Sequence, residues 1–358
     1  MSAPVTLPEA GATVQVATGN GLTLGALSGD GALVKTAGGT LTVAAASGRT
    51  GVTEIRGGEL ALKDGGNVGS GELVLDGAAS LRATGSTAAT LANPVTLKSS
   101  ASGEPIVWTQ ERGLTLSGAL DWRTGVGVVY KWGTNDLVLA GTGGSVSGTP
   151  KLYHRQGGLV FASGANYTLT GNTRESIKLG LNANDKTSMT VEPGARLSVG
   201  GILVSAAASN TTGNDALLTQ NGGEVALNNV SGDSGDTFYL RDWGTAPATY
   251  VMNGGVFTMP SAAWANLGNY GPGRIRVNGG SMTLGRVAAG YQTATNANGG
   301  SAEVTVNGGR LAAAGSWSWA SDRGARAFYT RVNGGTLALP ATRAYATNVN
   351  GWAELALA

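Results

Sequence analysis

The sequence predicts an all-β protein, a parallel β-helix (solenoid) with roughly three short strands per coil and one continuous domain over residues 1–358. The first observation is a turn of sequence Asn-Gly-Gly that occurs five times after residue 220, at spacings of 25 to 32 residues, because a fixed turn with a period of this size is typical of solenoids. The second is that apolar and polar residues alternate between turns with a period of two, as in half-buried strands. The third is a composition with 60 Gly and only 10 Pro, which suits many strands joined by tight turns.

Residues 1–100 form a first block of repeats. Short runs of Leu, Val and Thr alternate with polar residues, and several of them follow a Gly-Gly pair. Each such run is expected to be a strand that buries one face. The runs are 22–24, 33–35, 40–43, 57–62 and 73–81.

Residues 101–200 repeat the first block with longer turns. The segment 113–116 matches 21–24, and 131–139 matches 35–43. The offset between matching segments grows from 92 to 116 residues. Insertions therefore fall in the turns while the strands are kept, as a solenoid allows.

Residues 201–358 form the Asn-Gly-Gly block, in which each unit has about three strand-like pieces. Successive glycines let the corner backbone take a positive φ, which Asn also tolerates. The asparagines of these turns are Asn221, Asn253, Asn278, Asn307 and Asn333. Two interpretations are open: the amides stack into a ladder along the axis, or Asn is simply a favoured turn residue.

The composition excludes several classes of protein. Lys and Arg number 24 against 22 Asp and Glu, so neither nucleic acid nor an anionic membrane is an expected partner. Cysteine is absent, which removes disulfides, thiolate metal sites and Cys nucleophiles. No run approaches 18 apolar residues, so no membrane span is expected in this chain. The first residues lack the features of a signal peptide; export then uses a segment outside this chain, or the chain is a mature fragment with an added Met.

A pattern in the second block resembles the autotransporter-associated β-strand repeat of bacterial surface proteins. It is Lys131-x-Gly133-Thr134-x-x-Leu137-x-Leu139-x-Gly141-Thr142, followed by Gln156-Gly157-Gly158-Leu159. The segment 35–43 with 56–60 follows the same pattern, and the Asn-Gly-Gly units are similar to the continuation found in large repeat-rich bacterial surface proteins. The resemblance implies a right-handed parallel β-helix that a Gram-negative-type bacterium displays or secretes. The family's translocator barrel and signal peptide are not in this chain, so it is expected to be a passenger fragment or a free secreted subunit.

The sequence offers few candidates for catalysis or metal binding. His154 is the only histidine, and a metal site would need further His or Cys ligands. The run Gly232-Asp233-Ser234-Gly235 is similar to the nucleophile loop of trypsin-like proteases, but Asp236 follows where that family has Gly, so an insertion loop is the simpler interpretation. Asp233, Asp236 and Asp242 could hold a weak Ca²⁺, although they lack the spacing of an EF-hand. No catalytic residue, cofactor or metal is therefore assigned.

Aromatic and arginine residues concentrate in the last third of the chain. If their side chains share one outer face, the coil spacing would stack them into a ladder suited to a sugar or a partner protein. The other interpretation is that the aromatic residues fill the coil interior or cap turns. The candidate residues are Trp243, Trp264, Tyr270, Tyr291, Trp317, Trp319 and Tyr329, with Arg274, Arg276, Arg323, Arg326 and Arg331.

The predicted function is a non-enzymatic structural or adhesive module, located outside the cell or at the cell surface, with glycans or cell-surface proteins as partners. The first and last segments, 14–24 and 337–357, have the pattern of ordinary strands without caps. Either neighbouring coils are missing, or copies of the chain pair end to end into filaments. The alternative function is a polysaccharide-binding protein or a carbohydrate-active lyase or glycosidase, which would need paired carboxylates in a groove.

Overall fold

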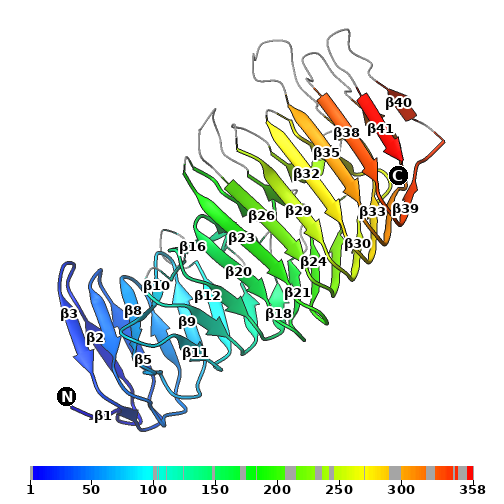
Figure 1. Ribbon diagram of the computed structural model, residues 1–358. Coiled ribbons are helices and arrows are strands. Elements are labelled where there is room, and N and C mark those ends of the chain that lie inside the picture. Colours follow the sequence, from blue (N-terminus) through cyan, green and yellow to red (C-terminus); the bar gives the residue numbers. More distant parts are fainter. Residues whose placement is uncertain are drawn as a thin grey trace. The chain divides into compact units, whose positions relative to one another are not determined.

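The structure, a computed structural model, confirms the all-β parallel solenoid (Figure 1). It describes residues 3–99, 103, 105–109, 111–123, 125–146, 150–169, 175–182, 184–205, 215–229, 236–241, 246–269, 271–289, 300–319, 327–341, 343–345 and 353–357. All regular elements within these residues are strands. No helix in this part of the chain is long and apolar enough to cross a membrane.

The chain divides into two compact units. Unit 1 comprises Met1–Leu152, Gln156–Val160 and Ala165–Tyr167, and unit 2 comprises Tyr153–Arg155, Phe161–Gly164 and Thr168–Ala358. The strands β19 (Lys151–His154), β20 (Gly157–Phe161) and β21 (Asn166–Leu169) contribute residues to both. The single continuous domain over residues 1–358 remains a prediction.

The strands of unit 1 are short, mostly of three to five residues, and are separated by tight turns. They are β1 (Val5–Thr6), β2 (Ala12–Gln15), β3 (Gly21–Leu24), β4 (Leu27–Ser28), β5 (Leu33–Thr36), β6 (Thr40–Val43), β7 (Thr53–Ile55), β8 (Glu59–Lys63), β9 (Leu73–Asp76), β10 (Ser80–Thr84), β11 (Ala89–Leu91), β12 (Val95–Lys98), β13 (Ile106–Trp108), β14 (Leu114–Leu116), β15 (Leu120–Trp122), β16 (Val128–Trp132), β17 (Leu137–Leu139) and β18 (Gly143–Val146).

Three sheets carry the coils of unit 1, together with the short pair β1-β4. Sheet 1a has the order β18-β15-β12-β9-β7-β5-β2, sheet 1b the order β3-β6-β8-β10-β13-β16, and sheet 1c the order β11-β14-β17. Each strand pairs in parallel with the equivalent strand of the next coil, as β8 does with β10. The third sheet begins only at β11, so three strands per coil is correct from β11 onward, while the coils before it alternate between sheets 1a and 1b.

The strands of unit 2 follow a regular rotation through three sheets. They are β22 (Ile177–Leu179), β23 (Lys186–Val191), β24 (Arg196–Val199), β25 (Ile202–Val204), β26 (Asp215–Gln220), β27 (Glu224–Leu227), β28 (Asp236–Leu240), β29 (Ala248–Met252), β30 (Val256–Thr258), β31 (Trp264–Leu267), β32 (Pro272–Val277), β33 (Ser281–Leu284), β34 (Arg286–Ala289), β35 (Ser301–Val306), β36 (Arg310–Ala313), β37 (Trp317–Trp319), β38 (Ala327–Val332), β39 (Thr336–Ala338), β40 (Arg343–Tyr345) and β41 (Ala353–Leu357).

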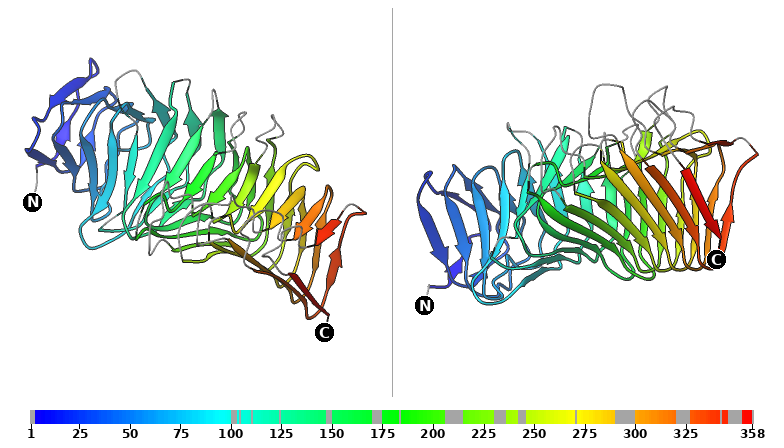
Figure 2. Two further views of the ribbon diagram at one scale, coloured as in Figure 1. Left: turned by 90° about the horizontal axis from the view of Figure 1, so that it is seen from above. Right: turned by 45° about the horizontal axis from the view of Figure 1, so that its top comes forward.

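Every third strand of unit 2 belongs to the same sheet, as the predicted three pieces per coil require. Sheet 2a has the order β22-β25-β28-β31-β34-β37-β40, sheet 2b the order β23-β26-β29-β32-β35-β38-β41, and sheet 2c the order β24-β27-β30-β33-β36-β39. Figure 2 shows these strands lying parallel within each sheet. Backbone hydrogen bonds thus run from coil to coil, at the spacing of about 4.8 Å that strands of one sheet adopt.

The core of unit 2 lies between its three sheets and consists of the inward-facing half of each strand. Phe238 from sheet 2a, Tyr250 from sheet 2b and Phe257 from sheet 2c meet there, with ring centroids 5.2 to 5.9 Å apart. All three side chains are fully buried, and each contributes roughly 1.5–3 kcal/mol by leaving water. One coil cannot bury these rings alone, so stacking of coils creates the core.

Candidate functional site

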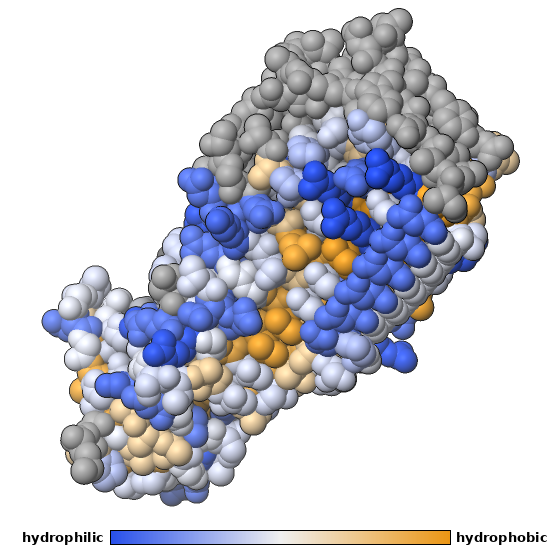
Figure 3. Space-filling model, viewed as in Figure 1, coloured by the Kyte–Doolittle hydropathy of each residue, from blue (hydrophilic) through white to orange (hydrophobic). Residues whose placement is uncertain are grey.

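The asparagines of the Asn-Gly-Gly turns form a continuous exposed stack between sheets 2b and 2c. Each Nδ2 donates a hydrogen bond to the Oδ1 of the asparagine one coil earlier. The distances are 3.0 Å from Asn253 to Asn221, 2.9 Å from Asn278 to Asn253, 2.8 Å from Asn307 to Asn278 and 2.8 Å from Asn333 to Asn307. Figure 3 shows a straight hydrophilic band across the region of β29 to β38, where this exposed stack lies. The ladder interpretation of these turns is confirmed.

The hydrogen bonds of the stack all run in one direction, and its first asparagine donates to a carboxylate. Nδ2 of Asn221 lies 3.3 Å from both carboxylate oxygens of Glu192, which precedes the Pro-Gly turn of the coil before. A carboxylate only accepts hydrogen bonds, so Glu192 satisfies a donor without offering one. The donated hydrogen bond of each side-chain amide in the stack therefore points toward lower residue numbers.

The second glycine of each turn has a backbone conformation that other residues rarely adopt. At Gly280 φ is +79°, and a Cβ there would lie 2.5 Å from the carbonyl oxygen of Gly255 one coil earlier. Gly255 and Gly309 have the same sign of φ and equally close neighbours. The turns of successive coils are thus in direct backbone contact, which brings the asparagine amides within hydrogen-bond distance.

Buried polar side chains hold other corners from the inside, and the sequence analysis missed this role. Nζ of Lys131 is fully buried and donates to the carbonyl oxygens of Gly133 at 2.6 Å, of Asn135 at 2.7 Å and of Gln156. Burial lowers the pKa of Lys131 to about 7, against a smaller raising effect of Asp136. One side chain thus donates to three turn carbonyls that face the interior, and those of Gly133 and Asn135 also accept from Thr109 Oγ1.

Lys35 and Arg49 have the same function in earlier coils of unit 1. Nζ of Lys35 donates to the carbonyl oxygens of Ala37 at 2.5 Å and Gly57 at 2.7 Å, and burial lowers its pKa. The guanidinium of Arg49, 1% exposed, donates to Gly31 O at 2.5 Å and to Thr53 Oγ1 at 2.6 Å. The sequence did indicate that Lys35 points inward, because it lies two positions after the inward-facing Leu33 and so shares its strand face.

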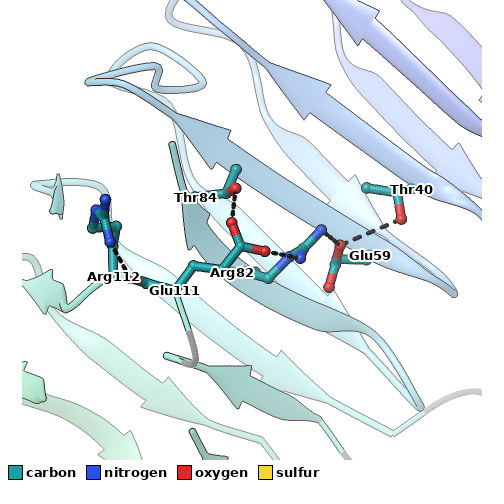
Figure 4. A network of polar contacts seen from close by, with 6 residues as sticks. All are labelled: Thr40, Glu59, Arg82, Thr84, Glu111 and Arg112. Atoms are coloured by element: carbon teal, nitrogen blue, oxygen red, sulfur yellow. Dashed lines mark hydrogen bonds and ion pairs between the residues drawn. The ribbon is translucent and has the colours of Figure 1, made fainter. Parts of the chain in front are cut away.

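A network of ionic contacts lies on the outer face of sheet 1b (Figure 4). Arg82 on β10 bridges two carboxylates, that of Glu59 at 2.7 Å and that of Glu111 at 2.5 Å. Thr84 also donates to Glu111, and this hydrogen bond is the first cause that lowers the pKa of Glu111, followed by the charge of Arg82. This cluster does not follow from sequence spacing, because strand register brings together residues that lie 29 positions apart.

An aromatic pair continues this outer row of sheet 1b. In register, Arg82 is followed by Trp108 on β13 and Trp132 on β16. The two indoles are half-buried, with ring centroids 5.4 Å apart and planes tilted by 43°. The sequence analysis sought aromatic residues only in the last third of the chain and so missed this pair.

The aromatic and arginine zone of the last third is not one face. Trp264 is half-buried at the start of β31 in sheet 2a, whereas Arg274, Arg276, Tyr329 and Arg331 lie on the outward side of sheet 2b. Trp317 is fully buried, so the interpretation that the aromatic residues fill the coil interior is correct for this residue and the outer-face interpretation is not. Trp317 aligns with the inward-facing Val287, and it fills the coil interior. Trp319 ends β37, and its side chain is outside the described residues, as are Trp243, Tyr270, Tyr291, Arg323 and Arg326.

A shallow hollow of about 460 Å³ opens beside Trp264. Its lining residues are Ser261, Ala262, Trp264, Arg286, Ala314, Gly315 and Ser316. Trp264 and Arg286 are direct neighbours in the register of β31 and β34. The guanidinium carbon of Arg286 lies 5.6 Å from the centroid of the indole, within the range of a cation–π interaction.

The remaining candidates from the sequence are a buried histidine and acidic residues that lie outside the described part of the chain. His154 is fully buried, and its Nε2 lies 3.1 Å from the carbonyl oxygen of Ser188. The run 232–235, the side chain of Asp236, and Asp242 lie outside the described residues. Where residues are described, no group of three or more His, Cys, Asp or Glu side chains could hold a metal ion.

No protein-family model matches the chain, and no curated protein or solved structure is significantly similar to it.

Proposed function

We propose that the chain is a non-enzymatic structural or adhesive module of a bacterial surface or secreted protein. The observation that carries the proposal is the asparagine stack of unit 2. Its amides are exposed, yet those of Asn253, Asn278, Asn307 and Asn333 each donate to the asparagine of the preceding coil. A corner built in this way stiffens the connection between coils and contributes no reactive group.

The exported location rests on the resemblance of the segment that begins at Lys131 to the autotransporter-associated repeat. Buried Lys35 and Lys131 occupy the matching positions of the two segments, which supports treating them as copies of one motif. Glycans and cell-surface proteins are the partners that such a module would contact outside a cell.

Further copies of the chain are also proposed as partners. Among the described strands, β2 and β3 end their sheets in unit 1, and β40 and β41 end theirs in unit 2. A strand at the end of a sheet has unpaired N–H and C=O groups that can pair with another chain, and end-to-end pairing gives a filament. Electron microscopy of the purified chain at micromolar concentration tests this: fibres of uniform width are expected, and only separate short particles would contradict it.

Single-molecule pulling on the purified chain tests the structural role. A variant with Asn253, Asn278 and Asn307 replaced by Ala should unfold at lower force. Asn228→Ala is the matched control, because Asn228 is an exposed asparagine outside the stack whose Nδ2 donates to Ser198 Oγ at 2.6 Å. Equal unfolding forces in the wild type and the triple variant would contradict the proposal.

A carbohydrate-active enzyme is the alternative function, and the carboxylates that flank Arg82 do not favour it. A glycosidase needs one carboxyl group with a raised pKa as a general acid. Glu59 and Glu111 both contact Arg82, and the pKa of Glu111 is lowered. Product formation from any member of a panel of polyuronates and neutral glycans would overturn the non-enzymatic proposal.

A further inference from the structure

The hollow beside Trp264 results from unequal corner lengths in three successive coils. Between sheets 2c and 2a, the first corner uses residues 259–263, the second only Gly285, and the third residues 314–316. A Cβ on Gly315 would lie 2.5 Å from the carbonyl oxygen of Ser261. The first and third corners therefore meet across the short middle one, and a concave surface remains around Arg286, the first residue after it.

Trp264 and Arg286 form a pre-arranged pair in this hollow. The indole is half-buried, while Arg286 is exposed. The cation–π contact at 5.6 Å places the guanidinium over the ring. Among the described residues no carboxylate pairs with Arg286, in contrast to Arg274, which lies 3.3 Å from Glu303. The donors of Arg286 are therefore available to an anion.

We propose that this hollow binds a pyranose sugar that carries a carboxylate, such as a uronic acid residue of a polysaccharide. An aromatic ring offers an apolar surface to the C–H face of a sugar, and a guanidinium binds a carboxylate through two parallel hydrogen bonds. The hydroxyl groups of Ser261 and Ser316 line the same hollow and can bond to the sugar hydroxyls. The volume of about 460 Å³ lies within the range of small-molecule sites.

Charge and shape favour a carboxylated sugar over a neutral sugar or a simple anion. A neutral sugar has no carboxylate for the guanidinium to bind, and an inorganic anion has no C–H face to pack against the indole. The proposal goes beyond the structural role of the solenoid, which would stand if no sugar bound here.

Calorimetric titration of the full chain with tetragalacturonate tests the proposal, with a neutral galactose tetramer and sodium sulfate as comparison ligands. Tetragalacturonate should bind more tightly than the other two. Arg286→Gln and Trp264→Ala should each weaken binding about tenfold or more, since each removes one of the two contacts. Arg286→Lys should bind with intermediate affinity, because an ammonium cannot form the paired hydrogen bonds.

Arg310→Gln is the matched control, because it removes the same charge from an exposed position on the neighbouring sheet 2c. Its affinity for tetragalacturonate should equal that of the wild type. Absence of tetragalacturonate binding, equal binding of the neutral tetramer or of sulfate, or unchanged binding by Arg286→Gln would each overturn the proposal. The urea midpoints of all variants separate loss of the site from loss of the fold.

Discussion

Lys131 and the asparagine stack both provide hydrogen-bond partners for the polar groups of stacked turns. Lys131 does so from inside the coil, and the asparagines do so on its surface. Stacked turns crowd polar groups of successive coils together, and unpaired buried groups are costly. In unit 1 a single buried ammonium donates to three inward-facing carbonyls, two of which also accept from Thr109. In unit 2 exposed amides pair with one another outside the core, coil after coil. The contacts of Lys131 involve one turn region and a group that titrates. The asparagine contacts repeat in successive coils and involve uncharged side chains, except at Glu192.

The largest effect is expected where the backbone of successive turns touches. Gly280→Ala should destabilise unit 2 by about 3 kcal/mol or more, since a Cβ would be strained at φ +79° and would lie 2.5 Å from Gly255 O. Gly164→Ala is the control, because Gly164 has φ +80° but a methyl group there would point into open space, with no neighbouring atom within 4 Å; its cost should be about 1 kcal/mol. Urea denaturation measures both, and equal losses would contradict the importance of contact between turns.

Removing the internal donor should have the next largest effect. Lys131→Met leaves the carbonyls of Gly133, Asn135 and Gln156 without this partner, at an expected cost of roughly 2–4 kcal/mol. Lys35→Met should cost less, because Lys35 bonds to two carbonyls. Lys63→Met changes an exposed lysine and should stay within about 0.5 kcal/mol of the wild type. A Lys131→Met variant as stable as Lys63→Met would show that the corner does not depend on the ammonium.

The pH dependence of stability distinguishes the two corners further. The pKa of Lys131 is lowered from 10.5 to about 7 by burial, so between these values the unfolded state binds more protons than the folded state. The free energy of unfolding should therefore rise with pH from about 7 to 10.5 by a contribution that Lys131→Met lacks. Urea midpoints of the two proteins across this window give the difference. Parallel curves would contradict a lowered pKa at this position.

The sequence predicted those features of the fold that repeat at nearly constant spacing. The strands, their parallel stacking and the five turn asparagines follow from the period-two pattern and from the Asn-Gly-Gly turns. Lys131 was identified only as part of a motif. It lies two positions after the buried Val129, and so on the strand face that points into the core. The position of Trp317 stayed open between an outer face and the interior, because the pattern Trp-Ser-Trp does not show whether the strand face that carries both indoles points inward.

The Trp264–Arg286 pair could not be found from repeat spacing alone. The turn asparagines on either side of this coil, Asn253 and Asn278, are 25 residues apart. The register instead joins Trp264 to Arg286, 22 positions later, and Val287 to Trp317, 30 positions later. Corners of different length shift the offset within a coil, so only the structure shows which outward side chains are neighbours.

The smallest effect is expected from reversing one polar group in the asparagine stack. Asn278→Asp removes the donor to Asn253 but keeps an acceptor for Asn307, and it places a carboxylate next to an amide oxygen. A loss of about 1–2 kcal/mol is expected at pH 7. Below the ordinary Asp pKa of about 3.9 the introduced carboxyl group carries a proton and can donate to Asn253 again, so the loss of stability relative to wild type should shrink.

Asn278→Ala cannot regain the donor, and its loss of stability should be the same at both pH values. Urea midpoints at pH 7 and pH 3 measure the contrast; a loss in Asn278→Asp that does not change with pH would show that the direction of the stack contributes nothing to stability.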